Sequence, residues 1–138
     1  MRTAIDTNVL SAVLSNEATA GAAVQQLSAA KREGALLICP FVYSELLAYP
    51  GASQAFMDEF LHETSIRVDF LVPQEVWMEA GKRFARYARR RRTAHGQPRR
   101  LLADFLIGAH ALLQSDRLIT LDPRRYRQDF PELTIISP

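Results

Sequence analysis

The sequence has almost no cysteine and no long apolar run. Its 138 residues include one cysteine, Cys39, so neither an intramolecular disulfide nor a cysteine-rich zinc site can form, which suits a reducing cytoplasm. No apolar run approaches the roughly 20 residues that a membrane-spanning helix needs. Asp6 and Asn8 interrupt the opening stretch MRTAIDTNVL, which is therefore too polar for a signal peptide. We expect a soluble, cytoplasmic protein with no membrane partner.

Lysine is scarce as well, because 15 of the 17 basic residues are arginine. The charges are also unevenly distributed. Residues 1–70 carry 4 basic and 8 acidic side chains (net −4), and residues 71–138 carry 13 and 7 (net +6), in agreement with the overall charge of +2. An arginine-rich half raises the expectation of a phosphate-bearing partner.

Strand-like and helix-like patterns alternate along the chain, with no repeat and no long linker. Short apolar runs predict strands at 3–5, 35–39, 66–71, 118–120 and 133–136. Helical spacing predicts helices after Asp6 and at 19–33, 40–49, 53–63, 73–91 and 101–113, with a loop at 93–98. Strands separated by helices favour parallel pairing, so we expect one domain over residues 1–138. Its predicted architecture is a three-layer α/β/α sandwich with a central, mostly parallel sheet of four to five strands.

The helix expected at 73–91 has an apolar and a basic side. Trp77, Ala80, Phe84 and Ala88 are predicted to face the core. The opposite side is predicted to carry a basic stripe made of Lys82, Arg83, Arg86, Arg89 and Arg90. This stripe could contact RNA phosphates, remain a solvated face, or receive an acidic protein tail.

Four carboxylates occupy positions that a stability argument does not favour. Asp6 and Asp122 come directly after predicted strands, and Glu45 and Asp104 interrupt apolar helix faces. Because the carboxyl ends of parallel strands meet at one edge of a sheet, all four can lie together there. Each also has a simpler explanation: Asp6 and Asp104 as helix caps, Asp122 as a turn residue, and Glu45 as an exposed side chain.

A cluster of four carboxylates needs a cation. Two carboxylates 4 Å apart repel by about 4 kcal/mol at an effective dielectric near 20. Oxygen ligands without histidine or cysteine suit Mg²⁺ or Mn²⁺ and argue against zinc. A metal ion held in this way can activate water and stabilise charge on a phosphoryl oxygen, which is the chemistry of phosphodiester hydrolysis. His62, His95 and His110 lack metal-ligand spacing, and structural or exposed roles are expected for them.

Four segments resemble a known family. IDTNVL at 5–10, SELL at 44–47, ADFLIGAHALL at 103–113 and LITLDPRRY at 118–126 are similar in order and spacing to PIN-domain nucleases, in particular VapC-like toxins of type II toxin–antitoxin systems. The resemblance implies a three-layer α/β fold and an acidic site that holds Mg²⁺ or Mn²⁺. It also implies cleavage of single-stranded RNA, neutralisation by a cognate antitoxin protein, and homodimer formation.

The resemblance also assigns roles to residues. It implies that Asp6, Glu45, Asp104 and Asp122 are the family's acidic quartet, with Asp6 and Asp104 as direct metal ligands. Asn8 and Thr120 match positions that orient acids or water. The family commonly has arginine where this chain has Leu121, which removes a charged contact at the mouth of the site.

Further arginines lie close in sequence to the acids. Arg99, Arg100, Arg124 and Arg125 are predicted to contact the phosphates of an RNA substrate. The resulting hypothesis is a Mg²⁺- or Mn²⁺-dependent endoribonuclease that is the toxin of a toxin–antitoxin pair.

Three other functions were weighed. A phosphatase of the haloacid dehalogenase type also has an aspartate after the first strand, but it needs a second aspartate where this chain has Asn8. A non-catalytic PIN-like module that binds RNA or a protein partner is disfavoured because all four acids are present. A PIN nuclease acting in general RNA processing remains an open alternative.

Overall fold

A parallel sheet forms the centre of the molecule. The computed structural model describes residues 1–97 and 99–138, so Pro98, the last residue of the predicted 93–98 loop, lies outside the described residues. The strands are β1 (Arg2–Ile5), β2 (Ala35–Ile38), β3 (Ile66–Val68), β4 (Arg117–Ile119) and β5 (Ile135–Ile136). They pair in the order β3-β2-β1-β4-β5, and every pairing is parallel. The predicted sheet is confirmed, and β1 lies at its middle.

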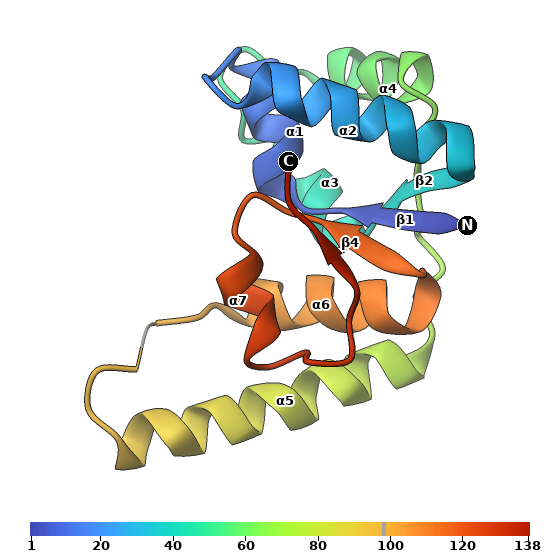
Figure 1. Cartoon of the computed structure of the whole chain (residues 1–138). Coiled ribbons are helices and arrows are strands. Elements are labelled where there is room, and N and C mark those ends of the chain that lie inside the picture. Colours follow the sequence, from blue (N-terminus) through green and yellow to red (C-terminus); the bar gives the residue numbers. More distant parts are fainter. Residues whose placement is uncertain (98) are drawn as a thin grey trace.

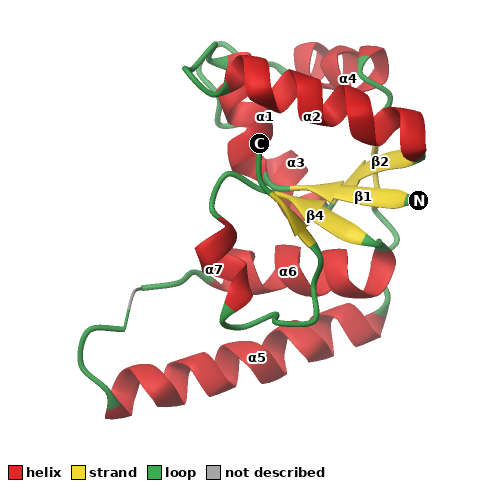
Figure 2. Ribbon diagram, viewed as in Figure 1, coloured by secondary structure: helices red, strands yellow, loops and turns green. Residues whose placement is uncertain are grey.

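Helices cover both faces of this sheet (Figures 1 and 2). On one side lie α1 (Thr7–Leu14), α2 (Ala20–Glu33) and α4 (Gln54–Glu63), and on the other α6 (Leu102–Gln114) and α7 (Pro123–Arg127). The short α3 (Pro40–Leu46) follows β2, and the long α5 (Gln74–Thr93) lies outside α6. Among the described residues, no helix has the length and apolarity to cross a membrane.

Local sequence explains several element boundaries. Pro40 stands at the first turn of α3, where its missing N–H costs nothing. The Ser53 hydroxyl caps α4 by accepting the Phe56 N–H at 3.0 Å. Gly34 follows α2 because its backbone passes so close to Met1 that a Cβ would overlap it. The five-residue α7 was not predicted, because such a short helix leaves no periodic pattern to detect.

The buried face of α5 differs from the predicted one. Val76, Ala80, Arg83 and Tyr87 are buried, whereas Trp77 is 49% exposed, so the prediction that Trp77 faces the core is wrong. Trp77 instead contacts the Phe41 ring edge-on, with ring centroids 5.8 Å apart. The helix is rotated because its partner is α6, against which the aromatic rings of α5 pack.

The predicted basic stripe of α5 is also wrong in part. Arg83 is only 7% exposed. Its guanidinium pairs with Glu79 at 3.0 Å and with Glu132 at 2.7 Å, and it donates to the Asp129 carbonyl at 2.8 Å. Arg90 pairs with the buried Asp129 carboxylate at 2.6 Å. These two arginines therefore attach α5 to the segment that follows α7.

Candidate active site

Asp6 is the most buried acid of the site. It follows β1 directly, its backbone N–H donates to the Ile119 carbonyl at 2.9 Å, and the residue is 2% exposed. Oδ1 accepts the Thr7 N–H at 2.8 Å. Oδ2 accepts the hydroxyl groups of Thr120 at 2.8 Å and Tyr126 at 2.9 Å. Three donors thus fix the carboxylate at the carboxyl end of the central strand.

Burial disturbs the ionisation of this group. It raises the pKa of Asp6, although the hydrogen bonds from Thr120 and Tyr126 and the positive charge of Arg125 oppose the increase. Burial and the Asp6 charge raise the pKa of Tyr126 well above its usual value. Tyr126 therefore remains a donor at neutral pH, and the charged form of Asp6 is poorly solvated by the fold.

Arg125 links two more of the acids. Asp104 is the third residue of α6, and its Oδ2 accepts the Leu101 N–H at 3.1 Å. Its Oδ1 accepts a hydrogen bond from Nη1 of Arg125 at 3.3 Å. Nε of Arg125 lies 3.4 Å from Oδ2 of Asp122. The guanidinium therefore lies between the carboxylates of Asp104 and Asp122.

The charge balance of Arg125 reflects this position. Burial alone would lower its pKa, but the carboxylates of Asp104, Asp6 and Asp122 and the Tyr126 hydroxyl outweigh burial and raise it. The side chain is 34% exposed, so its contacts with the acids are partly screened by water. Arg125 is the cation that partly neutralises the acids in this structure.

Glu45 lies at the exposed rim of the same region. Its Oε1 accepts the Thr7 hydroxyl at 2.7 Å, and Thr7 is the neighbour of Asp6. Figure 1 shows that α1 and α3 approach the carboxyl end of β1 from one face of the sheet, and that α7 and the start of α6 approach it from the other face. The four acids are therefore gathered at one edge of the sheet, and Glu45 reaches it through Thr7.

Asn8 and Thr120 connect the elements that carry the acids. Asn8 Oδ1 accepts the Leu121 N–H at 3.1 Å, and its Nδ2 donates to the Thr120 hydroxyl at 3.4 Å. The same hydroxyl accepts the Asp122 N–H at 3.1 Å while donating to Asp6. Thr120 is thus the junction between the first and the last acid.

The four carboxylates match a divalent ion in chemistry but not in spacing. The carboxylate oxygens are the hard ligands that Mg²⁺ and Mn²⁺ prefer. Among the described residues, however, no three acidic, histidine or cysteine side chains are gathered closely enough to form a metal site. The guanidinium of Arg125 is interposed instead. The donors fit a divalent ion in chemistry, and the Arg125 guanidinium occupies part of the space between Asp104 and Asp122.

The predicted arginines are divided between two environments. Arg99, which is exposed, and Arg100, which is half-buried, line an open cavity of about 530 Å³ beside α5. Arg124 is exposed on α7, and Arg125 faces the acids.

His110 is fully buried on α6, where Nε2 lies 2.9 Å from Oδ2 of Asp69. This contact agrees with a structural role for His110.

Sequence reasoning missed three contributors to this site. Tyr126 and Thr7 bind acids through hydroxyl groups, and Arg125 was assigned to RNA phosphates rather than to the acids. The only available signal was the closeness of Tyr126 and Arg125 to Asp122 in sequence. Their pairing with Asp6 and Asp104 depends on the fold.

Comparisons with known proteins bear on this arrangement. Residues 3–131 match the PIN domain. The chain belongs to the PIN-domain family. Its structure is similar to that of VapBC2 from Rickettsia felis bound to a DNA fragment from their promoter, with a TM-score of 0.72, 17% identity, and coverage of 100% of this chain and 99% of that one. It is also similar to VapBC-1 from nontypeable Haemophilus influenzae, with a TM-score of 0.71, 19% identity, and coverage of 99% and 98%. A search of curated proteins gave no significant match.

Proposed function

We propose that this PIN-domain chain is a metal-dependent endoribonuclease that hydrolyses RNA phosphodiester bonds. The observation that carries the proposal is the gathering of Asp6, Glu45, Asp104 and Asp122 at one edge of the sheet, with a buried Asp6 at its centre. A poorly solvated carboxylate and a bridging arginine are costly for stability alone. They suit a site that is built to receive a cation and a phosphate.

In this mechanism Asp6 and Asp104 would hold Mg²⁺ or Mn²⁺, and Glu45 and Asp122 would support them. The bound ion would supply activation of water and stabilisation of charge on the phosphoryl oxygens. The hydroxyl groups of Thr120 and Tyr126 keep the Asp6 carboxylate in one orientation. Asn8 holds Thr120, and the Thr7 hydroxyl orients Glu45. The preorganised hydrogen bonds reduce the reorganisation that binding requires.

Cleavage of a mixed pool of structured RNAs tests this proposal. The purified chain is assayed with Mg²⁺, with Mn²⁺ and with EDTA, beside Asp6→Asn and Asp104→Asn. We expect cuts that need metal and that both variants lose by at least about 100-fold, as for other essential electrostatic groups. Asp58→Asn is the matched control because Asp58 is exposed on α4, accepts the Tyr43 hydroxyl at 2.8 Å, and should retain activity when changed.

Two outcomes would contradict the nuclease assignment. Folded protein, free of any copurified antitoxin, that cuts no RNA under any of these conditions would favour the non-catalytic binding module. Cuts that persist equally in EDTA and in Asp6→Asn would point to a contaminating ribonuclease. Either result removes the metal-dependent mechanism.

We further propose that the physiological role is that of a toxin, with a cognate antitoxin as partner and a homodimer as the active form. The similarity to the two VapBC structures supports this role over general RNA processing. Expression of the chain alone should stop growth, expression of Asp6→Asn should not, and co-expression of the cognate antitoxin should restore growth. Normal growth with active enzyme would favour the RNA-processing alternative.

A further inference from the structure

We propose that the open cavity between the end of α5 and the segment leading into α6 is a binding groove for the backbone of single-stranded RNA. The groove, of about 530 Å³, is lined on its α5 side by Arg91 and Arg92 and on its other side by Arg99 and Arg100. This inference rests on the proposed function, because it describes how an RNA strand approaches the acids. It assigns Arg91 and Arg92 a role that they share with Arg99 and Arg100.

The charges of the groove are left unpaired by the protein. Across residues 1–97 and 99–138, none of these four guanidinium groups lies within 4.0 Å of a carboxylate oxygen. Arg83 and Arg90, on the same helix, are both paired with acids. Four permanent cations around one cavity repel one another and create a positive potential that attracts a polyanion.

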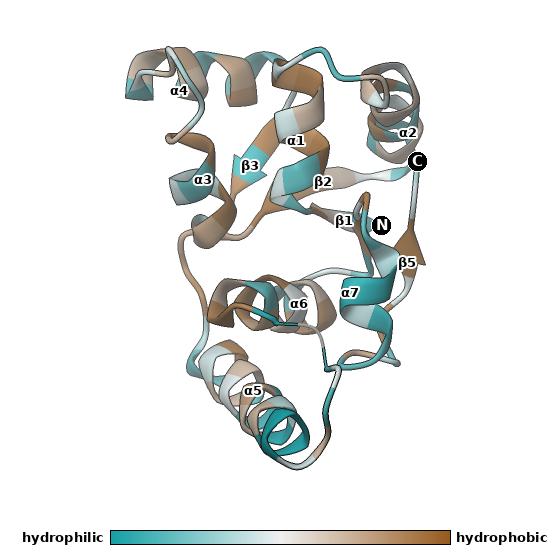
Figure 3. Ribbon diagram, turned by 90° about the vertical axis from the view of Figure 1, so that its left-hand side faces the viewer, coloured by the Kyte–Doolittle hydropathy of each residue, from teal (hydrophilic) through white to brown (hydrophobic). Residues whose placement is uncertain are grey.

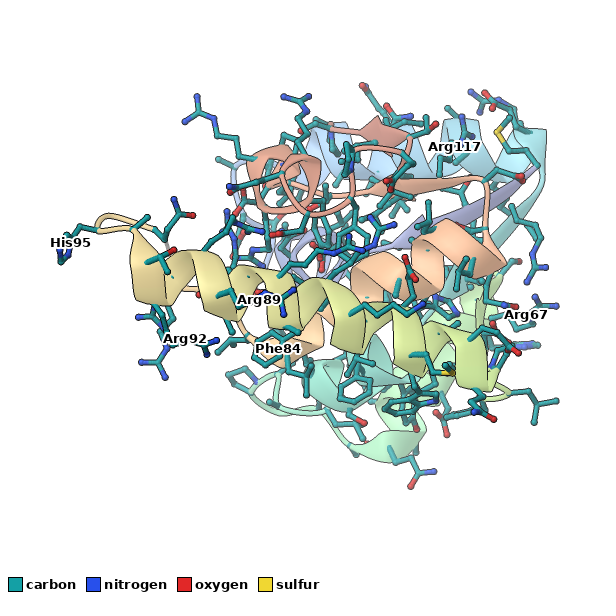
Figure 4. The ribbon with its side chains drawn as sticks, turned by 90° about the horizontal axis from the view of Figure 1, so that it is seen from below. Arg67, Phe84, Arg89, Arg92, His95 and Arg117 are labelled. Carbon is teal, nitrogen blue, oxygen red and sulfur yellow. The ribbon has the colours of Figure 1, made fainter. Side chains whose placement is uncertain are left out.

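The arginines of the groove lie on a different side of α5 from the other exposed arginines of this helix. At 3.6 residues per turn, Arg91 and Arg92 share a side of the helix with Phe84 and Ala88, and Arg86 and Arg89 point away from it. Phe84 and Ala88 also line the groove, and Figure 4 shows Phe84 and Arg92 along one edge of α5. The teal end of α5 in Figure 3 marks the hydrophilic part of the helix.

The groove also has apolar walls, which favour a single strand over a duplex. Leu101 is 59% exposed and Leu102 is 47% exposed, and both line the cavity together with the half-buried Phe84. The faces of unpaired bases can lie on such surfaces while guanidinium groups hold the phosphates. In duplex RNA the base faces are stacked and hidden, so the apolar walls would gain nothing.

One wall of the groove borders the first turn of α6, which carries Asp104. Leu101 donates its N–H to Oδ2 of Asp104 at 3.1 Å, and Leu102 is the first residue of α6. A strand lying along Leu101 and Leu102 therefore reaches the first turn of α6, where Asp104 stands. An RNA substrate must reach Asp104, whereas an acidic protein tail need not. The closeness of the groove to Asp104 therefore favours RNA as its ligand.

Fluorescence anisotropy of a labelled single-stranded RNA tests the groove separately from catalysis. Binding is measured in EDTA, with gels to verify intact RNA, as a function of KCl concentration. We expect the double variant Arg91→Gln/Arg99→Gln to bind about tenfold more weakly at 0.1 M salt. The slope of log K against log salt should fall by about 1.4, because each contact with a single strand contributes about 0.7. Arg86→Gln/Arg89→Gln removes the same charge from the other side of α5 and should change the slope little.

Each alternative outcome is decisive. Equal losses in the two double variants would mean a general charge effect and would overturn the groove. Tighter binding of duplex than of single-stranded RNA would also overturn it, as would Arg91- and Arg99-dependent binding of polyglutamate without binding of RNA. Catalysis can fail while the groove binds RNA, or succeed while the groove variant binds normally, so the failures of the two proposals are distinguishable.

Discussion

Arg125 occupies the position in which a metal-free acidic site needs a cation. Its guanidinium bridges Asp104 and Asp122, and neither contact is shorter than 3.3 Å. The contacts are partly exposed, so each is weak enough to be exchanged. A divalent ion bound by the same carboxylates must compete with Arg125, and a displaced guanidinium is then free to contact the phosphate of the substrate.

We expect Arg125→Gln to bind Mn²⁺ about tenfold more tightly than the unaltered chain, a difference of about 1.4 kcal/mol. The physical reason is that the ion no longer displaces a positive charge from Asp104. Isothermal titration calorimetry measures the affinity directly. Arg124→Gln is the matched control, since Arg124 is exposed and adjacent. Equal or weaker Mn²⁺ binding by the Arg125 variant would contradict the competition.

We expect Asp6 to lower the free energy of unfolding of the metal-free protein at neutral pH. Its pKa is raised by burial, so the folded state holds the proton more tightly than the unfolded state. Stability contributed by this group is therefore greatest at low pH, where Asp6 is protonated in both states. It falls as the pH rises through the ordinary aspartate range to the folded-state pKa.

Asp6→Asn removes this cost. In EDTA at pH 7 we expect the variant to melt a few degrees above the unaltered chain. The difference should shrink as the pH falls from the folded-state pKa of Asp6 into the ordinary aspartate range, and it should vanish below that range. Thermal denaturation followed by circular dichroism at several pH values measures this. A lower melting temperature at pH 7 would show that the hydrogen bonds from Thr120 and Tyr126 stabilise the charged form more than burial destabilises it.

At the scale of elements, α5 is held by an ion-pair network as well as by apolar packing. Arg90 pairs with Asp129, whose side chain is 3% exposed. Arg90→Gln leaves that carboxylate buried without its cation, and we expect a loss of about 3 kcal/mol in the free energy of unfolding. Urea unfolding measures it. Arg89→Gln, on the exposed side, should stay within about 0.5 kcal/mol of the unaltered chain, and a similarly small loss in both variants would contradict the network.

The contact between α6 and the segment after α7 depends on a glycine. Gly108 lies against the ring of Phe130, and a Cβ at this position would overlap the ring. Gly108→Ala should therefore destabilise the fold by about 1–3 kcal/mol, because the buried Phe130 has little room to move. Gly81→Ala is the control, since α5 is open there and alanine is the better helix former, with a gain of about 0.5–1 kcal/mol. Chemical denaturation of the two variants should give opposite signs.

The elements were largely predictable, and the reason is physical. The apolar run at 35–39 and the spacing of apolar residues around 101–113 depend only on local sequence, and they gave β2 and α6. The face that α5 buries does not depend on local sequence alone. A tryptophan looks more suitable for a core than an arginine, yet Arg83 is buried because Glu79, Glu132 and the Asp129 carbonyl satisfy its donors.

The same distinction applies to the candidate site. The acids were recognisable because Asp6 and Asp104 stand against apolar surroundings in the sequence. Their mutual arrangement was not, since Tyr126 reaches Asp6 across 120 positions of the chain. Hydrogen bonds of that kind are a product of the strand order and leave no trace in the pattern near either residue.

At the scale of the whole molecule, large apolar side chains are exposed in the segment that leads into α5 and in its first two turns. Phe70 is 64% exposed, Leu71 88%, Trp77 49% and Met78 51%. Phe70 and Trp77 also line an apolar cavity of about 190 Å³. A patch of this kind is typical of a protein interface.

We expect this patch to hold the proposed homodimer together. Light scattering after size-exclusion chromatography should give twice the 15.5 kDa of one chain, and Leu71→Asp should reduce the mass to one chain. Phe56→Asp is the control, because Phe56 is 46% exposed on α4, on the other side of the sheet. An unaltered chain that is monomeric, or a dimer that survives Leu71→Asp, would contradict the assignment.

The central position of β1 determines when the acidic site can form during translation. β1 pairs with β4, and Asp6 receives its donors from Thr120 and Tyr126, all more than 110 positions later. A ribosome-bound fragment that has not yet exposed residue 126 therefore has Asp6 without these partners. At about 5–20 residues per second, translation of the 120 positions from Asp6 to Tyr126 takes about 6–24 s. The proposed nuclease site is therefore incomplete in any nascent chain whose residue 126 has not left the ribosome.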